Sequence, residues 1–400
     1  ASLKLYLTKH AHKNAEIHDL RMAFEETTGE DLNWFFNQWF YASGHPMLNI
    51  NYEYNDSLKT QTVYIEQQQN FKTTPLYRLP IKIDLYVDGK VERNEVVIDQ
   101  AVNTFTFKVA SKPNLVNVDG DKMLLCEKVD NHTNEEWSFM YYNAPKYMDR
   151  YEALKKLSQV DEAVAAKVTT DALDDKYAHI RRTSLRDIKL AIKNDSEAVK
   201  GKLLNLLKTE KNTRVKGDAI AVLAKHFGTE EGVLAIAKEG VEEQSYYIAG
   251  RSLSALSLIN KGEAMTYAKK YETEENLSLI NAVAEVYEVH GGAEQNKFFI
   301  EKYDELGGFG KYSFISSYGN YLKNQPEEVV QEALPLLERV SLEEKAWWMR
   351  MTGINVVAEL ENNYAQQVMD YQKELKTVKG DSPEGVALTA KIEKTEEQIQ

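Results

Sequence analysis

The eight histidines of this 400-residue chain are the side chains best suited to bind zinc or activate water. A zinc peptidase helix of the H-E-x-x-H type places two histidines one turn apart, and the glutamate between them acts on the water. That pattern and its inverted form are both absent from the sequence. His12 and Glu16 lie four residues apart, but a closed zinc site needs three or four ligands. A solvated helix face explains this pair better than a metal site.

The other motifs that could carry chemistry are incomplete. No G-x-S-x-G turn is present, and the glycine cluster at 307–310 lacks both a preceding strand and a following Lys-Ser/Thr, so it predicts a loop. Asp119-Gly120-Asp121 lacks the further ligands of a calcium loop and indicates a tight turn. The single cysteine, Cys126, ends an apolar run and indicates a buried structural thiol. We therefore expect no catalytic residue and no metal site among these residues.

Composition narrows the class of protein. Lys and Arg number 49 against 62 Asp and Glu, and this net charge of −13 argues against binding to a nucleic-acid backbone. No run of 18 apolar residues exists, so we expect no membrane span. A length of 400 residues favours two to four domains. One cysteine fits a cytoplasmic or an exported protein equally well. Residues 1–10 look like the middle of a helix, so we interpret the chain as a piece of a longer protein.

Two helices are predicted in residues 1–46. An apolar face of the first helix holds Leu20, Ala23 and Phe24. A second helix follows Glu30-Asp31 and ends at Gly44-His45-Pro46, where proline cannot continue it. The aromatic residues of that second helix have helical spacing, and we interpret them as core rather than as a binding platform. They are Trp34, Phe35, Phe36, Trp39, Phe40 and Tyr41.

Residues 47–130 change to a period of two, which is typical of strands. Leu79, Ile81 and Ile83 alternate with polar neighbours, and Asp88-Gly89 is a strong two-residue hairpin signal. Several short strands separated by turns predict an all-β sandwich.

Residues 140–400 are helical in pattern and contain a repeat. A small residue recurs every 30 to 36 residues, and apolar residues or tyrosines follow it one and four positions later. The small residues are Ala153, Ser184, Ala219, Ser252, Ala282, Ser317 and Gly353. This period predicts a HEAT- or armadillo-like helical solenoid in which the small residue allows close helix contact. An irregular helical bundle remains the alternative. The predicted fold class is thus multidomain α and β: a short helical stub (1–46), a β-sandwich (47–130) and an all-α solenoid (140–400).

The motifs of the stub resemble those of a known family. The segments that carry the resemblance are Glu16-Ile17-His18-Asp19-Leu20, Phe24-Glu25, Thr28-Gly29-Glu30-Asp31-Leu32, Phe35-Phe36-Asn37-Gln38-Trp39 and Ser43-Gly44-His45-Pro46. Together they are similar to the end of the thermolysin-like catalytic domain in the aminopeptidase N family of zinc peptidases. Residues 67–71 and Leu79-Pro80-Ile81 are similar to strands of that family's sandwich, and the order stub, sandwich, solenoid resembles its last three parts.

The resemblance implies a parent protein that removes N-terminal residues from peptides with a zinc-bound water. The family's zinc helix, glutamate ligand, catalytic tyrosine and amine-recognition strand all precede this region, so the chain itself is expected to be non-catalytic. Zinc is expected in the full-length parent and no cofactor in the chain. The implied partners are the missing N-terminal and catalytic domains of the same polypeptide and, in the parent, peptide substrates.

In that family the solenoid closes a chamber over the active site. Four cations near the start of the helical array are therefore candidate peptide-binding residues, because a positive lining attracts a peptide's C-terminal carboxylate. They are Arg181, Arg182, Arg186 and Lys216. Ordinary solvated helix charges are the alternative for each of them. For the whole chain, the alternative function is that of a catalytically inactive relative that acts as a protein-binding scaffold.

Overall fold

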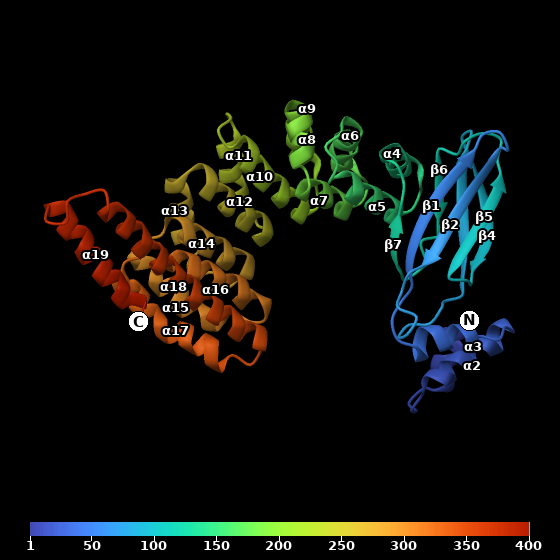
Figure 1. The fold of residues 1–400 in the computed structure, drawn as a ribbon, viewed down its shortest axis with the longest axis horizontal. Coiled ribbons are helices and arrows are strands. Elements are labelled where there is room, and N and C mark those ends of the chain that lie inside the picture. Colours follow the sequence, from blue (N-terminus) through green and yellow to red (C-terminus); the bar gives the residue numbers. More distant parts are fainter. Residues whose placement is uncertain (400) are drawn as a thin grey trace. The chain divides into compact units, whose positions relative to one another are not determined.

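The computed structural model describes residues 1–399, and the chain forms two compact units, residues 1–196 and 197–400. Short helices come first, then β-strands, then helices to the end (Figure 1). This order confirms the predicted fold class. The predicted domain limits at 1–46, 47–130 and 140–400 remain a prediction.

The first unit begins with α1 (Ser2–Lys9), α2 (Ile17–Thr28) and α3 (Asn33–Phe36), the last continued by a π-helical turn over Asn37–Tyr41. The backbone N–H of Glu16 donates to Asp19 Oδ2 at 2.8 Å, which caps the start of α2. Gly29, with a φ of 75°, ends α2 in the left-handed conformation that glycine favours.

The strands form two sheets. They are β1 (Met47–Asn55), β2 (Thr60–Gln67), β3 (Leu79–Val87), β4 (Lys90–Ile98), β5 (Val102–Lys108), β6 (Leu115–Val118) and β7 (Glu127–Asp130). One sheet has the order β5-β2-β1-β7 and the other β4-β3-β6. Ile50 and Ile65 of the first sheet and Ile83 and Ile98 of the second are fully buried in one shared core. This shared core is what a two-layer sandwich requires.

The hairpin predicted at Asp88-Gly89 is present between β3 and β4. Both residues have positive φ, 48° and 75°, which is the backbone of a type I′ turn. The first and last strands of the larger sheet, β1 and β7, are neighbours and run parallel, with Met47 opposite Glu127.

Helices α4 to α8 complete the first unit: α4 (Asn134–Asn143), α5 (Tyr147–Leu157), α6 (Ala163–Asp171), α7 (Ala178–Arg186) and α8 (Lys189–Asn194), with a 3-10 turn over Ala172–Asp174. Trp137 of α4 and Leu154 of α5 share a core with Tyr86 and Leu115 of the smaller sheet. Helices α4 and α5 are therefore packed directly on the smaller sheet.

The second unit consists of helices: α9 (Ser196–Thr209), α10 (Thr213–Phe227), α11 (Val233–Val241), α12 (Tyr246–Ile259), α13 (Lys261–Tyr271), α14 (Leu277–His290), α15 (Asn296–Lys302), α16 (Phe309–Leu322), α17 (Glu327–Glu343), α18 (Trp347–Leu375) and α19 (Pro383–Ile399). Two 3-10 turns lie at Ala293–Gln295 and Tyr303–Glu305. Helices α10, α12, α14, α16 and α18 pack each on the next, and α11 and α13 pack on α12 (Figure 1). This is a solenoid-like layer; its assignment to the HEAT or armadillo type remains a prediction.

The burial of the repeat positions agrees with the predicted pattern in six of the seven repeats. The residues one and four positions after the small residue are almost fully buried there: Leu154, Leu157, Leu185, Ile188, Ile220, Leu223, Leu253, Leu256, Val283, Val286, Tyr318 and Tyr321. The prediction is wrong in α18, where Ile354 and Val357 are 46% and 39% exposed. Met349, Val356 and Leu360 are the buried positions of α18 instead, and α16, α17 and α19 pack on that helix.

Candidate functional site

The four predicted cations fall into two groups. Arg181, Arg182 and Arg186 lie on α7 in the first unit, and Lys216 lies on α10 in the second. Arg181 is half-buried and donates from Nη1 to the backbone oxygen of Asp175 at 2.7 Å, whereas Arg186 is exposed. The structure therefore brings the three arginines together on one helix.

Helix α7 and its neighbour α5 form a face with aromatic and basic side chains. His179, Arg182 and Arg186 have the spacing i, i+3, i+7 and so lie on the same side of α7. Tyr147 and Tyr151 of α5 stack on each other at 5.9 Å, and the His179 ring lies 5.3 Å from that of Tyr151. Tyr147 Oη and His179 Nδ1 are 2.6 Å apart and share a hydrogen bond. We call these five residues the α5–α7 face.

A buried carboxylate positions the start of α7 beside α5. Asp175 Oδ2 accepts from Arg150 Nε at 2.8 Å and from Tyr141 Oη at 3.2 Å, and Oδ1 accepts from the backbone N–H of Tyr177 at 2.9 Å. The Arg150 guanidinium also lies over the Tyr177 ring, 5.4 Å from its centre. Asp175 and Tyr177 directly precede α7, so these bonds hold the start of α7 against α4 and α5. They thereby fix the relative position of the helices that form the α5–α7 face.

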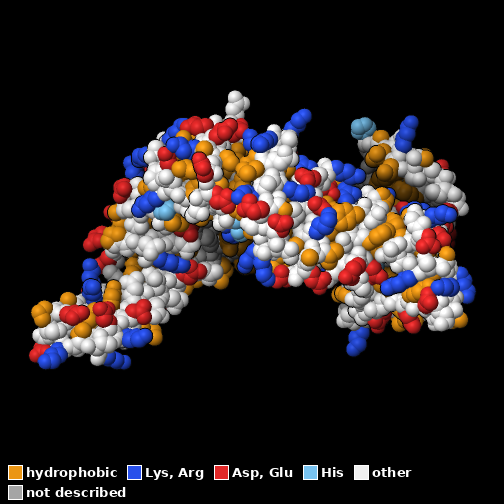
Figure 2. All heavy atoms as spheres, turned by 90° about the horizontal axis from the view of Figure 1, so that it is seen from above, with side chains coloured by type: hydrophobic (Ala, Val, Ile, Leu, Met, Phe, Trp, Pro, Cys, Tyr) orange, Lys and Arg blue, Asp and Glu red, His pale blue; other side chains and the backbone are white. Residues whose placement is uncertain are grey.

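This face has the chemistry to bind a carboxylate next to an apolar group. Guanidinium groups hold carboxylates with paired hydrogen bonds, and tyrosine rings offer a flat apolar surface with a polar edge. Acidic and basic side chains are interspersed over the side of the molecule drawn in Figure 2. The sequence reasoning found the arginines but missed the tyrosines and His179, although the i, i+4 spacing of Tyr147 and Tyr151 was available as a signal.

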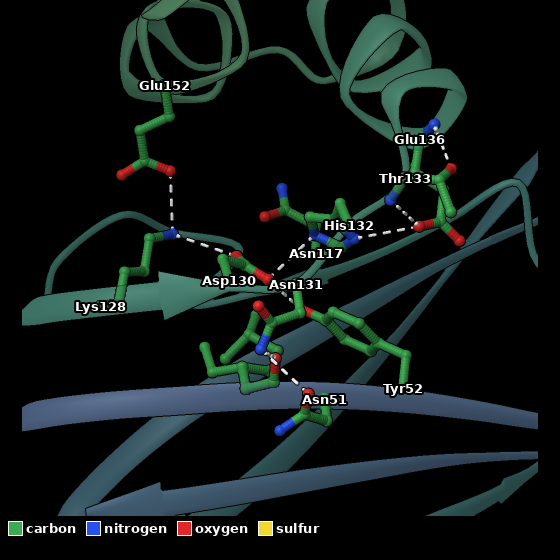
Figure 3. A network of polar contacts seen from close by, with 12 residues as sticks. Asn51, Tyr52, Asn117, Lys128, Asp130, Asn131, His132, Thr133, Glu136 and Glu152 are labelled. Carbon is green, nitrogen blue, oxygen red and sulfur yellow. Dashed lines mark hydrogen bonds and ion pairs between the residues drawn. The ribbon is translucent and has the colours of Figure 1, made fainter. Parts of the chain in front are cut away.

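A second group of polar side chains lies between the sheets and α4 and α5 (Figure 3). Tyr52 Oη donates to Asp130 Oδ1 at 2.5 Å, and His132 Nε2 lies 3.1 Å from the same oxygen. His132 Nδ1 lies 3.5 Å from Glu136 Oε2, and its ring stacks on Tyr52 at 4.6 Å and meets the edge of Trp137. The side chains of His132 and Asp130 are only 1% and 2% exposed, so a substrate has no access to them.

Two lysines with little exposed side chain extend this network. Lys128 Nζ lies 2.8 Å from Glu152 Oε2 and 3.5 Å from Asp130 Oδ2. Lys122 Nζ donates to Asn117 Oδ1 at 2.6 Å and lies 3.2 Å from the fully buried Asp149 carboxylate. Burial by itself lowers the pKa of Lys128, but attraction by the two carboxylates outweighs it and raises that pKa above its usual value. Lys128 therefore stays charged and ties β7 to α5.

The network also shifts the pKa of its other members. Burial and the neighbouring Asp130 raise the pKa of Tyr52 well above its usual range, so Tyr52 remains a hydrogen-bond donor. Burial raises the pKa of Glu136, but the interaction with His132 and a hydrogen bond from the backbone N–H of Thr133 outweigh it and lower that pKa below its ordinary value. The arrangement thus holds helices on the sheets. The sequence signal for it was limited to Thr133-x-x-Glu136, a capping box.

Two further predicted features lie beside this network. Asp119 accepts from the backbone N–H groups of Met123 and Leu124 at 3.2 and 2.9 Å, which confirms a tight turn there. Cys126 is half-buried, and burial raises the pKa of its thiol to about 11. Among residues 1–399, the structure shows no group of three or more His, Cys, Asp or Glu side chains placed to hold a metal ion. None of the helices in the same range is long and apolar enough to cross a membrane.

The N-terminal helices expose much of their apolar surface. Helix α1 buries no residue, and its Leu3 and Leu7 are 59% and 66% exposed. The predicted aromatic core is only partly correct, because Phe36 is buried while Phe35 and Phe40 are 37% and 46% exposed. Two short helices have too little area to enclose six aromatic rings, so several of their apolar side chains remain exposed.

The comparisons with known proteins concern the fold. No family model matches the chain. Among solved structures, the chain is similar to aminopeptidase A of Legionella pneumophila, crystallised in complex with aspartic acid, with a TM-score of 0.57 and 14% sequence identity. The similarity covers 98% of this chain and 53% of the aminopeptidase, so the chain spans about half the length of that protein. The chain therefore has an aminopeptidase-like fold.

Proposed function

We propose that the chain is the non-catalytic C-terminal part of a zinc aminopeptidase that removes N-terminal residues from peptides. The observation that carries the proposal is the match of 98% of this chain to 53% of an aminopeptidase. The order of stub motifs, strands and helices found in the sequence supports the same assignment. In the complete protein, zinc would be held by residues of the catalytic domain and would supply the activated water.

The exposed apolar side chains of the N-terminal helices are the proposed contact for that catalytic domain. Leu3 and Leu7 are exposed on α1, Phe35 on α3 and Phe40 on the π-helical turn that continues α3. Exposed large apolar side chains of this kind are expected where another part of a protein makes contact. The occupant that we propose is the catalytic domain of the same polypeptide.

The α5–α7 face is the proposed contact for the C-terminal carboxylate of a peptide substrate. Arg182 and Arg186 would bind the carboxylate, while Tyr147 and Tyr151 contact the last side chain. Arg181 is held by a backbone oxygen and would position the helix, and Lys216 remains a candidate in the second unit. On this proposal, the contact selects substrates by their C-terminus.

The test compares the purified 400-residue chain with the protein made from its complete reading frame. We expect the complete protein to hold about one zinc per chain and to hydrolyse aminoacyl anilides until a chelator removes the metal. The 400-residue chain should do neither. Activity or one tightly held zinc in the 400-residue chain would refute the proposal.

Substrate selection is tested in the complete protein with Arg186→Gln. Because one charged contact is lost, we expect KM to rise about tenfold for a peptide with a free C-terminus and to change little for its C-terminal amide. Lys189→Gln, an exposed cation on α8, is the matched control. An equal rise for acid and amide would contradict the assignment.

The alternative function is a scaffold whose parent has lost its zinc site. The exposed apolar side chains of the N-terminal helices fit this function as well, because it requires only a partner. Zinc analysis of the complete protein separates the two: a folded parent without bound zinc and without hydrolysis would favour the scaffold.

A further inference from the structure

A groove with an apolar floor lies among α9, α10 and α11 of the second unit. Its volume is about 300 Å³, and its floor consists of Leu204, Leu207, Ile220 and Ile236. Three of these four side chains are half-exposed rather than enclosed in the helical core. A cavity of this size, at the lower end for ligand sites, suits a small aliphatic group.

The rim of the groove carries charges of both signs. Lys216 Nζ pairs with Glu243 Oε1 at 2.5 Å, so those two neutralise each other. Lys208 on α9 and Glu239 on α11 are exposed and pair with no side chain in the part of the chain that the structure describes. Lys208 and Glu239 thus place one positive and one negative charge, from two different helices, at the rim of an aliphatic floor.

We propose that this groove binds a free aliphatic α-amino acid such as leucine. Its carboxylate would contact Lys208, its ammonium group Glu239, and its side chain the four floor residues. Two other classes of ligand fit the groove less well. A simple anion would be repelled by the carboxylates of Glu239 and Glu243, and an uncharged apolar ligand would make no ion pair with Lys208 or Glu239. This inference is independent of the proposed function, since it needs neither zinc nor a catalytic domain.

The first experiment titrates the 400-residue chain with four compounds in a calorimeter. Leucine should bind saturably at about 1 mM or below. N-acetyl-leucine, which represents a peptide C-terminus and lacks the ammonium group, and leucinamide, which lacks the carboxylate, should each bind about tenfold more weakly or worse. Glutamate should not bind, because its side chain carries charge onto the apolar floor.

The second experiment removes each rim charge. Lys208→Met and Glu239→Gln should each weaken leucine binding about tenfold or more. The matched controls, Lys211→Met and Glu231→Gln, change exposed charges that do not line the groove and should alter affinity less than about twofold. Thermal unfolding followed by circular dichroism checks that each variant is folded.

Three results would overturn the inference. They are no saturable binding of leucine to the unmodified chain, equal affinity for leucine and N-acetyl-leucine, and equal effects of the rim variants and their controls. The first two use the unmodified chain, so they hold even if a variant fails to fold.

Discussion

Leu253→Ala should destabilise the second unit strongly. Leu253 is fully buried on α12, within the core shared by the helices packed around it. The substitution removes three carbon groups, and each loses about 0.8 kcal/mol of burial. The remaining cavity adds to this because close-packed helices relax only partly, so we expect a total loss of about 3–4 kcal/mol in the free energy of unfolding.

Urea denaturation followed by far-ultraviolet circular dichroism measures this loss by linear extrapolation. Leu258→Ala on the same helix is the control, because Leu258 is 65% exposed. Its effect should stay within about 0.5 kcal/mol, the range for surface changes. If Leu253→Ala costs less than about 1 kcal/mol, or no more than the control, the assignment of Leu253 to a seam between repeats is wrong.

Four other outcomes are expected. Asp149→Ala should cost about 3–5 kcal/mol in the same assay, because it leaves a buried lysine and amide without their partner. Glu136 has a lowered pKa, so its stabilising contribution is complete above its unfolded pKa of about 4.3 and is lost as pH falls through the folded value. In pH-dependent urea titrations, Glu136→Gln should remove that acid-sensitive part. Cys126, with a thiol pKa of about 11, should react with iodoacetamide at pH 8 about a hundredfold more slowly in the folded than in the unfolded chain, followed by mass spectrometry. Hydrogen exchange should show residues 1–20 opening far below the global stability; protection equal to that of residues 79–109 would contradict the exposed packing of α1.

Local sequence patterns predicted most of the fold. The period of two located the strands, Asp88-Gly89 located a hairpin, and the repeat located buried seam residues such as Leu253. The repeat failed at Ile354, because the burial of a seam residue depends on which helices cover it, and the coverage of α18 differs from that of the earlier helices. Sequence spacing carries no information about that difference.

The candidate site was less predictable for the same reason. Arg182 and Arg186 were found from their charge, but Tyr147 reaches His179 only because α5 packs beside α7. The partners of His132 come from elements as distant in sequence as β1 and α4. No short motif encodes such contacts. Charge alone also gave no reason to expect that Lys216 lies in a different compact unit from the three arginines.

The parallel pairing of β1 with β7 has a consequence for synthesis. About 75 residues separate the end of β1 from β7, so at about 5–20 residues per second the ribosome needs roughly 4–15 s to supply the missing strand. During that time one hydrogen-bonding edge of β1 stays open, and open strand edges recruit other chains. Nascent chains that stall before residue 127 should therefore depend on chaperones more than those that stall after residue 130.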